Sequence, residues 1–380
     1  MRKLIYLDNH ATTPVDPRVL EAMLPYFREA YGNVASKSHS LGWLAERAAE
    51  QARRRVAELA GADSREVVFT SGATESNNLA LKGAFEQYRS RGNHFVTVAT
   101  EHRAVLDPLR HIEKFGAQVT VLPPRPDGLV ELDALRAALR PETVLVSVMY
   151  ANNEIGVIQP VRQIGALCRE RGVLLHTDAA QAFGKIPIAV ADENIDLMSL
   201  SAHKLYGPKG VGALYVRRSC SIAAQIHGGG HEGGLRSGTL NVPAIVGFGE
   251  ACLLCAREME GESARTQALR DRLKHRLETA LDGVAVNGSM ECRLPNNLNM
   301  SFAGIEADAL LTSLPGIALS TGSACSSATV EPSHVLRALG LSASAARSSV
   351  RFGLGRFNTE AEIDEAANLI VESVRRLRIV

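Results

Sequence analysis

The chain has 380 residues, of which 46% are hydrophobic and 22% charged, with a formal net charge of +1. This length allows two or three domains with a substantial core, and the near-neutral charge argues against binding nucleic acid or an anionic membrane. The chain shows neither a signal peptide nor a run of roughly 18 apolar residues, and its six cysteines do not form a disulfide framework, so we expect a cytoplasmic protein without membrane contact.

Strand-like apolar runs alternate with helical patterns through most of the chain. Apolar residues at helical spacing predict a helix around residues 44–59. Strand-like runs follow at residues 66–69, 94–99, 143–149, 173–178 and 197–200. This alternation predicts a largely parallel sheet with helices on both faces. Polar residues collect just after the strand ends, which is where such sheets bind ligands.

The pattern changes near Cys255. A charged segment with leucines every four residues from Leu269 to Leu281 predicts a long amphipathic helix. A strand-like run at residues 297–302 and a final helix near residues 359–377 come after it. We therefore place a domain boundary close to Cys255.

Lys204 follows Asp178 by some two dozen residues, and Asp178 closes an apolar strand. This pair suits pyridoxal phosphate (PLP), because the lysine forms the Schiff base and the aspartate keeps the pyridine nitrogen protonated, so that the ring can act as an electron sink. Each residue also has an ordinary alternative: Asp178 could cap a helix, and most lysines are solvated. A carboxylate at a strand end is nevertheless costly unless it is paired.

Residues 71–77 follow a strand and open a helix. The first-turn amides of such a helix form an anion site, to which Thr74 adds a hydroxyl. The alternative is an ordinary N-cap, and the presence of Lys204 favours phosphate binding.

Further polar residues complete the predicted cofactor site. Gln181 can donate to the phenolic oxygen of the cofactor, and Ser201 and His203 flank the lysine closely enough to reach the phosphate or brace the lysine. His102 can stack on the ring or shuttle protons, although alone it is equally typical of a surface loop. Thr239 ends a glycine-rich segment, and its hydroxyl can reach a phosphate.

Cys325 lies in a run of small residues, 320–328, without apolar neighbours. Structural cysteines are usually packed in a core, whereas a small-residue loop suits a thiol that must reach a substrate, so we interpret Cys325 as a nucleophile.

Arg351 can hold a substrate carboxylate bidentately; the alternative is a surface arginine on an edge strand. Neither residues 252–255 nor residues 227–231 have the pattern of a metal site, and no resident metal is expected.

Several motifs in matching order resemble the cysteine desulfurases of the class V aminotransferase superfamily, which have PLP fold type I. These motifs occupy residues 6–14, 71–78, 152–156, 176–181, 201–208, 236–239, 322–325 and 349–353. The cysteine loop resembles that of the long-loop, NifS/IscS-like group. The resemblance implies an α/β fold with a large domain (residues 16–256) built on a mostly parallel seven-stranded sheet. A smaller α+β domain (residues 1–15 and 257–380) would carry the cysteine loop.

The same resemblance implies that L-cysteine is converted to L-alanine and that its sulfur moves to Cys325 as a persulfide. The implied catalytic residues are Cys325, Lys204 and His102. The implied PLP-binding residues are Ala73, Thr74, His102, Asn153, Asp178, Gln181, Ser201, His203, Lys204 and Thr239. The implied substrate-binding residues are Asn33, Asn153 and Arg351.

The resemblance also implies partners. Thr239 would come from the partner subunit of a homodimer. The sulfur would pass to an acceptor protein such as an iron–sulfur scaffold, or serve tRNA thiolation, and Cys325 could ligate a cluster transiently.

The sequence departs from this family at a few positions. Val34 stands where proline is usual, and Gly233 replaces an arginine, so we expect altered loops or rim charge. Housekeeping members carry a longer C-terminal tail that contacts the scaffold protein, and no such tail follows the last helix here.

Two alternatives remain open. The first is a selenocysteine lyase or another class V lyase or transaminase, which would need Lys204 but not Cys325. The second is a non-catalytic sulfur-carrier docking module, against which the intact Lys204, Asp178 and Cys325 argue.

Overall fold

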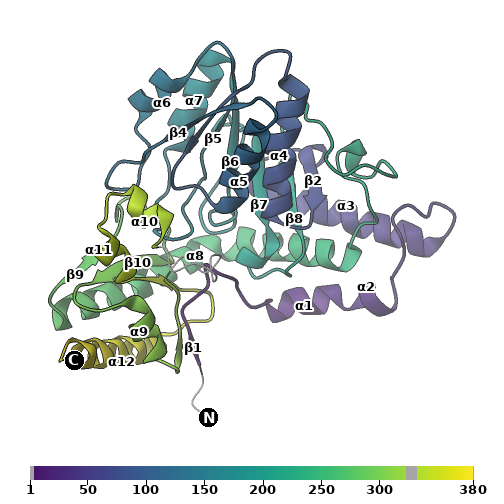
Figure 1. Cartoon of the computed structure of the whole chain (residues 1–380). Helices are drawn as coiled ribbons and strands as arrows, with labels where there is room; N and C mark the ends of the chain where they lie inside the picture. The colour runs from purple at the N-terminus through teal and green to yellow at the C-terminus, as the bar shows by residue number, and fades with distance from the viewer. Residues whose placement is uncertain (1–3, 322–331, 380) are drawn as a thin grey trace.

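The computed structural model describes residues 4–321 and 332–379. A seven-stranded sheet forms the centre of the larger part of the molecule (Figure 1). Its strands, in spatial order, are β2 (Val67–Thr70), β8 (Gly212–Val216), β7 (Leu197–Ser201), β6 (Leu174–Asp178), β5 (Thr143–Ser147), β3 (His94–Val98) and β4 (Gln118–Leu122). Neighbouring strands are parallel except where β8 runs antiparallel to β2 and β7. The predicted mostly parallel seven-stranded sheet is confirmed.

Two strands of this sheet, β4 and β8, were not among the expected runs. Strand β4 lies at the edge, and four of its five residues are exposed or half-buried, so its sequence lacks a continuous buried run. Strand β8 is fully buried, and a short continuous apolar run cannot be distinguished from a buried helical segment by periodicity alone.

Helices cover both faces of the sheet. On one face α4 (Ala73–Tyr88) and α5 (Arg103–Glu113) pack in one core. On the other face lies a larger core. The helices that contribute to it are α1 (Pro17–Met23), α3 (Ser40–Ala60), α6 (Leu132–Ala138), α7 (Val161–Arg171) and the first half of α8 (Val242–Ala280). The expected helix at residues 44–59 is α3, but its buried stripe is mostly alanine, and Leu44 is 41% exposed.

The smaller part of the molecule contains short strands and helices. It comprises β9 (Val284–Val286), β10 (Asn297–Phe302), β12 (Ser349–Gly353), α9 (Ala307–Thr312), α10 (His334–Ala338), α11 (Ala343–Arg347) and α12 (Glu360–Ile379). Strand β10 pairs antiparallel with both β9 and β12. Near the N-terminus β1 (Ile5–Tyr6) runs parallel to β11 (Ile317–Ala318), and Ile5 and Ile317 pack in the core of this smaller part.

Helix α8 passes without interruption from one core to the other (Figure 1). Its first half packs against α3, and Gly249 is required there because an added Cβ would lie 2.5 Å from the Cα of Ala52. Its second half contributes Leu269, Leu273 and Leu277 to the core of the smaller part. The predicted helix near residues 269–281 is therefore the end of a 39-residue helix. The separate cores support our proposal of two domains divided near residue 256.

In the described part of the chain, no helix is both long enough and apolar enough to cross a membrane.

Candidate active site

A cavity of about 560 Å³ lies at the carboxyl ends of the parallel strands. The predicted site residues that line it are Ala73, Thr74, His102, Asn153, Asp178, Gln181, Ser201, His203, Lys204 and Arg351. Two others, Asn33 and Thr239, are exposed and do not line the cavity within one chain. Cys325 lies outside the described residues. The structure thus brings together predicted site residues that are up to 278 positions apart, from Ala73 to Arg351.

Lys204 is held at the end of a short 3-10 turn (Ala202–Lys204) that directly follows β7. Its Nζ donates hydrogen bonds to the backbone oxygens of His10, at 2.5 Å, and Ala11, at 2.8 Å. Its own backbone oxygen accepts from Nζ of the buried Lys185 at 2.8 Å. Burial lowers the pKa of Lys185 to about 8. Lys204 is therefore anchored through its backbone on one side and by the N-terminal segment on the other.

Asp178 ends β6 and is 5% exposed. Its Oδ2 accepts a hydrogen bond from Nδ2 of Asn77 at 2.7 Å, and its Oδ1 accepts from the backbone N–H of Ala180 at 3.0 Å. Both carboxylate oxygens are therefore held in place by donors, one from α4 and one from the turn after β6. Asn77 was not predicted as a site residue, because a helical asparagine has no pattern that reveals its partner.

The start of α4 has the properties of an anion site. In the described structure no side-chain hydrogen bond caps this helix, which follows Gly72 at φ +150°. Ala73 and Thr74, in its first turn, line the cavity. An added Cβ at Gly212 would lie 2.6 Å from the Cα of Gly72, so this close approach of β8 requires glycine. Uncapped first-turn amides at the N-terminus of a helix bind phosphate readily.

His203 and Ser201 line the cavity together with Lys204. The Nδ1 atom of His203 is 3.1 Å from Oγ1 of Thr12. Burial, followed by the positive charge of Lys204, lowers the pKa of His203 to about 4. His203 is therefore neutral near pH 7 and can offer a hydrogen bond without adding charge.

His102 caps the N-terminus of α5. Its Nδ1 accepts a hydrogen bond from the backbone N–H of Ala104 at 3.0 Å, so the proton of the neutral ring lies on Nε2. The neighbouring Glu101 is fully buried, and its carboxylate accepts from the backbone N–H of Met149. Burial, and then the charge of Asp178, raise the pKa of Glu101 well above its ordinary value. Glu101 was not singled out from the sequence.

Arg351 reaches the cavity from β12 and is 2% exposed, so the alternative of a surface arginine is wrong. Its Nη1 donates to the backbone oxygen of Asn153 at 3.0 Å, and its Nη2 contacts Oδ1 of Asp8 at 2.8 Å. Its Nε has no partner in the described part of the chain. This unmatched N–H can donate a hydrogen bond to a carboxylate oxygen.

His10 is a cavity residue that was given no role from the sequence. It is 1% exposed, and its ring lies against Gln181, with Nδ1 2.9 Å from Oε1. Burial, followed by the charges of Arg351 and Lys185, holds the pKa of His10 well below its ordinary value. A single histidine beside a two-residue strand gives no periodic signal that would have identified it.

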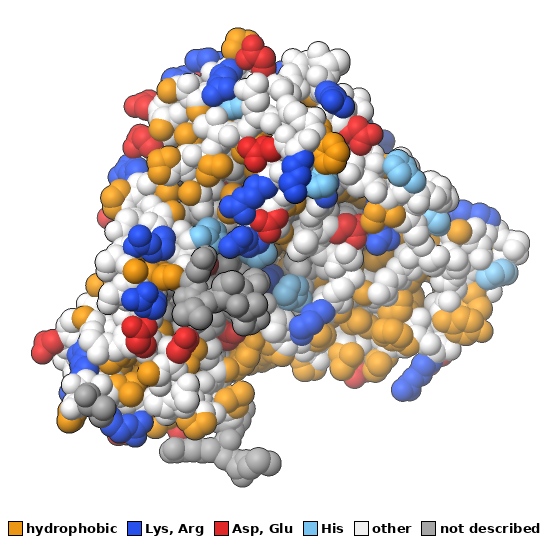
Figure 2. Space-filling model, viewed as in Figure 1, with side chains coloured by type: hydrophobic (Ala, Val, Ile, Leu, Met, Phe, Trp, Pro, Cys, Tyr) orange, Lys and Arg blue, Asp and Glu red, His pale blue; other side chains and the backbone are white. Residues whose placement is uncertain are grey.

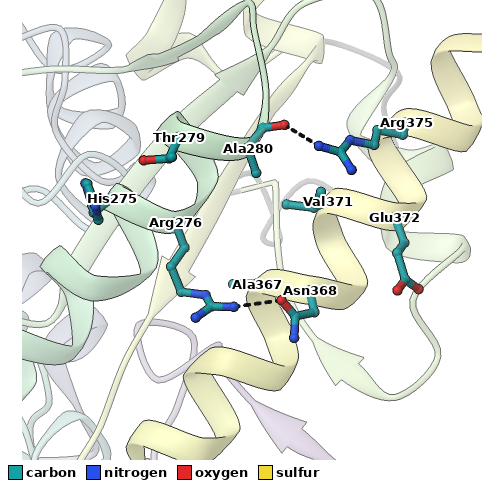
Figure 3. Close-up of a pocket in the computed structure, with 9 residues that line it drawn as sticks. All are labelled: His275, Arg276, Thr279, Ala280, Ala367, Asn368, Val371, Glu372 and Arg375. Carbon is teal, nitrogen blue, oxygen red and sulfur yellow. Dashed lines mark hydrogen bonds between the residues drawn. The ribbon is translucent and has the colours of Figure 1, made fainter.

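A second hollow, of about 610 Å³, lies between the ends of α8 and α12 (Figure 3). Its arginines contact the protein itself: Arg276 donates to Oδ1 of Asn368 at 2.7 Å, and Arg375 donates to the backbone oxygen of Ala280 at 2.9 Å. None of the predicted site residues that the structure describes lines it. We assign no reaction to this hollow.

The fold and the first cavity have the features of a PLP-dependent enzyme. The uncapped start of α4 fits a phosphate, the carboxylate of Asp178 fits a pyridinium nitrogen, and Lys204 fits covalent attachment. These features come from separate elements of the large sheet and its helices, and they meet where such sheets bind ligands.

Comparison with known proteins agrees with this class. The family described as aminotransferase class-V matches residues 5–366. A protein named cysteine desulfurase IscS, from Anaeromyxobacter dehalogenans, is 58% identical over 380 residues, which cover all of this chain and 94% of that protein. A protein of the same name from Methylococcus capsulatus is 56% identical over the same coverage.

Solved structures give the same result. A NifS-like protein superposes with a TM-score of 0.91 at 39% identity, over 97% of this chain and 98% of that one. A structure described as SspA in complex with cysteine has a TM-score of 0.83 at 38% identity, over 93% of this chain and all of that one. The chain belongs to the aminotransferase class-V family and, within it, to the cysteine desulfurases. Enzymes of this family depend on PLP.

Proposed function

We propose that the protein binds PLP, converts L-cysteine into L-alanine and transfers the sulfur to Cys325 as a persulfide. The observation that carries this proposal is a single cavity lined by Lys204, the paired carboxylate of Asp178 and the buried Arg351. An amino acid bound there would have its carboxylate at Arg351 and its amino group toward Lys204. The similarity to SspA, whose solved structure is a complex with cysteine, supports this choice of substrate.

The proposed PLP-binding residues divide by the part of the cofactor that they contact. The start of α4 with Thr74, together with Ser201 and His203, would hold the phosphate. Asp178 would contact the ring nitrogen, Gln181 the phenolic oxygen, and His102 the ring face. Bound PLP supplies an electron sink that makes the α and β carbons of an amino acid reactive.

The chain's own residues would perform the remaining steps. Arg351 binds the substrate carboxylate, and the amine of Lys204 removes the α-proton once it is uncharged. The thiolate of Cys325 attacks the substrate sulfur, so that a new S–S bond forms as the bond from the β carbon to sulfur breaks. The carbon fragment takes up protons and leaves as L-alanine. The persulfide then passes its outer sulfur to an acceptor, for which we propose an iron–sulfur scaffold protein.

We propose that the active form is a homodimer in which Thr239 of one subunit completes the phosphate site of its partner. Hydrophobic side chains gather over α1, α2 (Pro25–Arg28) and the start of α3 (Figure 2). Among them Phe27 is 58% exposed and Trp43 is 47% exposed. Apolar patches of this kind mark interaction surfaces. Light scattering should report a dimer. Thr239→Ala should weaken PLP binding without dissociating the dimer. A monomer with full PLP affinity would contradict the proposal.

The decisive experiment compares the wild-type protein with Cys325→Ala. Each is incubated with L-cysteine and a thiol reductant, and alanine and sulfide are quantified. We expect equal amounts of both products from the wild type and neither from Cys325→Ala, although the variant keeps its PLP absorption. Cys292→Ala, which changes a half-buried cysteine outside the cavity, serves as the matched control and should behave as the wild type.

Two outcomes would redirect the proposal. Full desulfuration by Cys325→Ala would remove the persulfide step. Release of selenide from L-selenocysteine by both proteins, with no reaction on L-cysteine, would favour a selenocysteine lyase.

A further inference from the structure

His10 combines deep burial with an unmatched polar atom. It follows β1 in the N-terminal segment, is 1% exposed and lines the cavity that contains Lys204. Its backbone oxygen accepts hydrogen bonds from both Lys204 and Gln181. The Nε2 atom of its ring is buried and has no partner among the residues that the structure describes. Buried polar atoms are nearly always hydrogen-bonded, so a donor is expected when the cavity is filled.

The contacts of Gln181 determine which ring nitrogen of His10 carries the proton. Nε2 of Gln181 donates to the backbone oxygen of His10 at 3.0 Å, which fixes the orientation of the amide. Oε1 of Gln181 then faces Nδ1 of His10 at 2.9 Å. Because an amide oxygen can only accept, Nδ1 must be the donor, and in the neutral ring Nε2 keeps a lone pair.

Burial and the positive charges around His10 keep its ring neutral. Burial is the first cause of its lowered pKa, and the positive charges of Arg351, Lys185 and Lys204 act in the same direction. The lone pair on Nε2 is thus retained at neutral pH. The second hydrogen on Nε2 of Gln181 remains available for the cavity, because the first is bonded to His10.

Two groups of bound L-cysteine could donate to this lone pair, its amino group and its thiol. The amino group would approach Nζ of Lys204, which lies 2.5 Å from the backbone oxygen of the same residue, His10. Arg351, at the carboxylate, is also an electrostatic neighbour of His10. Because His10 neighbours both Lys204 and Arg351, we take the amino group as the donor.

We propose that His10 is a further substrate-binding residue, whose Nδ1–H fixes Gln181 and whose Nε2 accepts a hydrogen bond from the amino group of the incoming amino acid. This inference rests on the proposed function, since it assumes an amino acid in the cavity. It assigns two separable roles to the two ring nitrogens.

Nuclear magnetic resonance of the PLP-loaded protein with ¹⁵N-labelled histidine tests the tautomer directly, and comparison with His10→Asn assigns the signal. We expect Nδ1 to carry the proton and Nε2 to resonate as a bare ring nitrogen. Addition of L-alanine, which has the same amino and carboxylate groups but no sulfur, should shift the Nε2 signal. A proton on Nε2 in the free protein would overturn the proposal. So would an unchanged Nε2 signal at alanine concentrations that alter the PLP absorption.

Two variants separate the roles in steady-state kinetics. In His10→Asn the amide nitrogen replaces Nδ1 and keeps the bond to Gln181, but the acceptor at Nε2 is lost. We expect the KM for L-cysteine to rise about five- to tenfold at similar kcat, as for one lost hydrogen bond, with the PLP absorption unchanged. His10→Gln places its amide near the Nε2 position and should recover part of KM while shifting the PLP absorption, because Gln181 is released.

An unaltered KM in His10→Asn would overturn the assignment of Nε2. Failure of the wild type to desulfurate L-cysteine would instead overturn the proposed function, whereas the tautomer measurement would stand on its own.

Discussion

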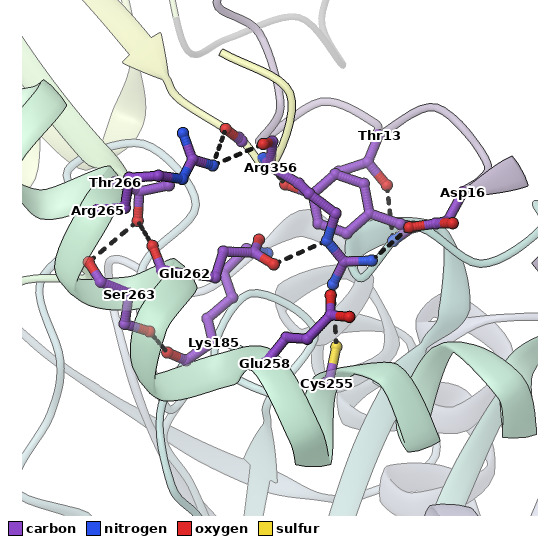
Figure 4. Close-up of polar contacts among 12 residues, drawn as sticks. Thr13, Asp16, Lys185, Cys255, Glu258, Glu262, Ser263, Arg265, Thr266 and Arg356 are labelled. Atoms are coloured by element: carbon purple, nitrogen blue, oxygen red, sulfur yellow. Dashed lines mark hydrogen bonds and ion pairs between the residues drawn. The ribbon is translucent and has the colours of Figure 1, made fainter. Parts of the chain in front are cut away.

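Two buried polar clusters meet at the segment that contains Lys204, and they differ in how fully their atoms are paired. In and around the cavity, Nε2 of His10, Oδ1 of Asn77, Oε2 of Glu101 and Nε of Arg351 are buried without partners among the described residues. The other cluster surrounds Arg356 (Figure 4), which contacts Asp16 at 2.7 Å and Glu262 at 2.8 Å. Its guanidinium also lies 4.3 Å from the ring centre of Tyr206.

This difference in pairing distinguishes a cluster that can bind a ligand from a cluster that stabilises the fold. In the Arg356 cluster both carboxylates meet an arginine, and Arg18 followed by Arg356 holds the pKa of Asp16 well below its ordinary value. Such a cluster joins the small part of the molecule to the large one, and in the described structure none of its buried side-chain polar atoms lacks a partner. The cavity, by contrast, keeps donors and acceptors unmatched, which is unfavourable until a ligand supplies the partners.

The largest expected effect concerns Lys204→Ala. Removing the amine should lower desulfuration by roughly 10³-fold or more and abolish the absorption of covalently bound PLP, while the midpoint of urea unfolding stays close to that of the wild type. Steady-state rates, absorption spectra and urea titrations check these results. Lys114→Ala, on the exposed end of α5, is the control and should leave all three unchanged. A large loss of stability in Lys204→Ala would erase the contrast between the clusters.

Arg356→Met should produce the opposite result. Asp16 and Glu262 would lose their shared partner in a mostly buried setting, so the free energy of unfolding should fall by about 3 kcal/mol. PLP binding at 25 °C should change little. Arg272→Ala removes an exposed arginine paired with Asp364 and should have a much smaller effect. Equal stabilities of the two variants would show that the Arg356 cluster does not join the two parts.

Lys185 lies between the two clusters, and its lowered pKa can be tested through the pH dependence of stability. Its pKa is lowered to about 8 in the folded chain, below the ordinary value of about 10.4 for lysine. Between about pH 8 and about pH 10.4 Lys185 is more protonated in the unfolded chain than in the folded one. Its contribution to the free energy of unfolding therefore increases as pH rises from about 8 to about 10.4, by at most about 3 kcal/mol. Lys185→Met should flatten the stability profile in this window, measured by urea unfolding at several pH values. Parallel profiles for both proteins would refute the lowered pKa.

The smallest expected effect concerns Asn77→Ala. Loss of its hydrogen bond to the carboxylate of Asp178 should weaken PLP binding by about tenfold or somewhat more, because the carboxylate is then less firmly oriented. Equilibrium titration with PLP measures this change. Asn78→Ala, which alters the next residue on α4 but bonds to a backbone oxygen of its own helix, is the matched control. Equal PLP affinity in both variants would show that PLP binding does not depend on the hydrogen bond from Asn77 to Asp178.

The sequence predicted the residues that follow strand ends but not those that support them. Lys204 and Asp178 could be proposed from the sequence because a charged residue at the end of a buried strand is unusual and because α/β sheets bind ligands there, and both line the cavity. His10, Asn77 and Glu101 could not, since their roles depend on contacts between segments far apart in the chain. The same holds for the burial of Arg351, which depends on the packing of β12 against the N-terminal segment.

The helices and strands of the fold were also predicted unevenly from the sequence. Runs with clear periodicity, such as α3 and most strands of the sheet, were placed close to their observed positions. The first half of α8 was not predicted as part of a long helix because it lacks regularly spaced leucines, and its glycines serve close contacts, Gly247 with Met23 of α1 and Gly249 with Ala52 of α3. The antiparallel direction of β8 is likewise set by the chain connection rather than by its composition.

The continuity of α8 has a geometric consequence for how the fold tolerates change. Its 39 residues extend about 58 Å at the usual rise per residue, and Lys204 and Arg351 depend on its two halves keeping one rotational phase. One residue inserted near Gly261 would turn everything beyond it by about 100° and move it about 1.5 Å along the axis. Arg351 would then leave the cavity although every strand and core could still form. By this geometry a residue added to a surface loop leaves the two halves in phase, whereas one added in the middle of α8 does not.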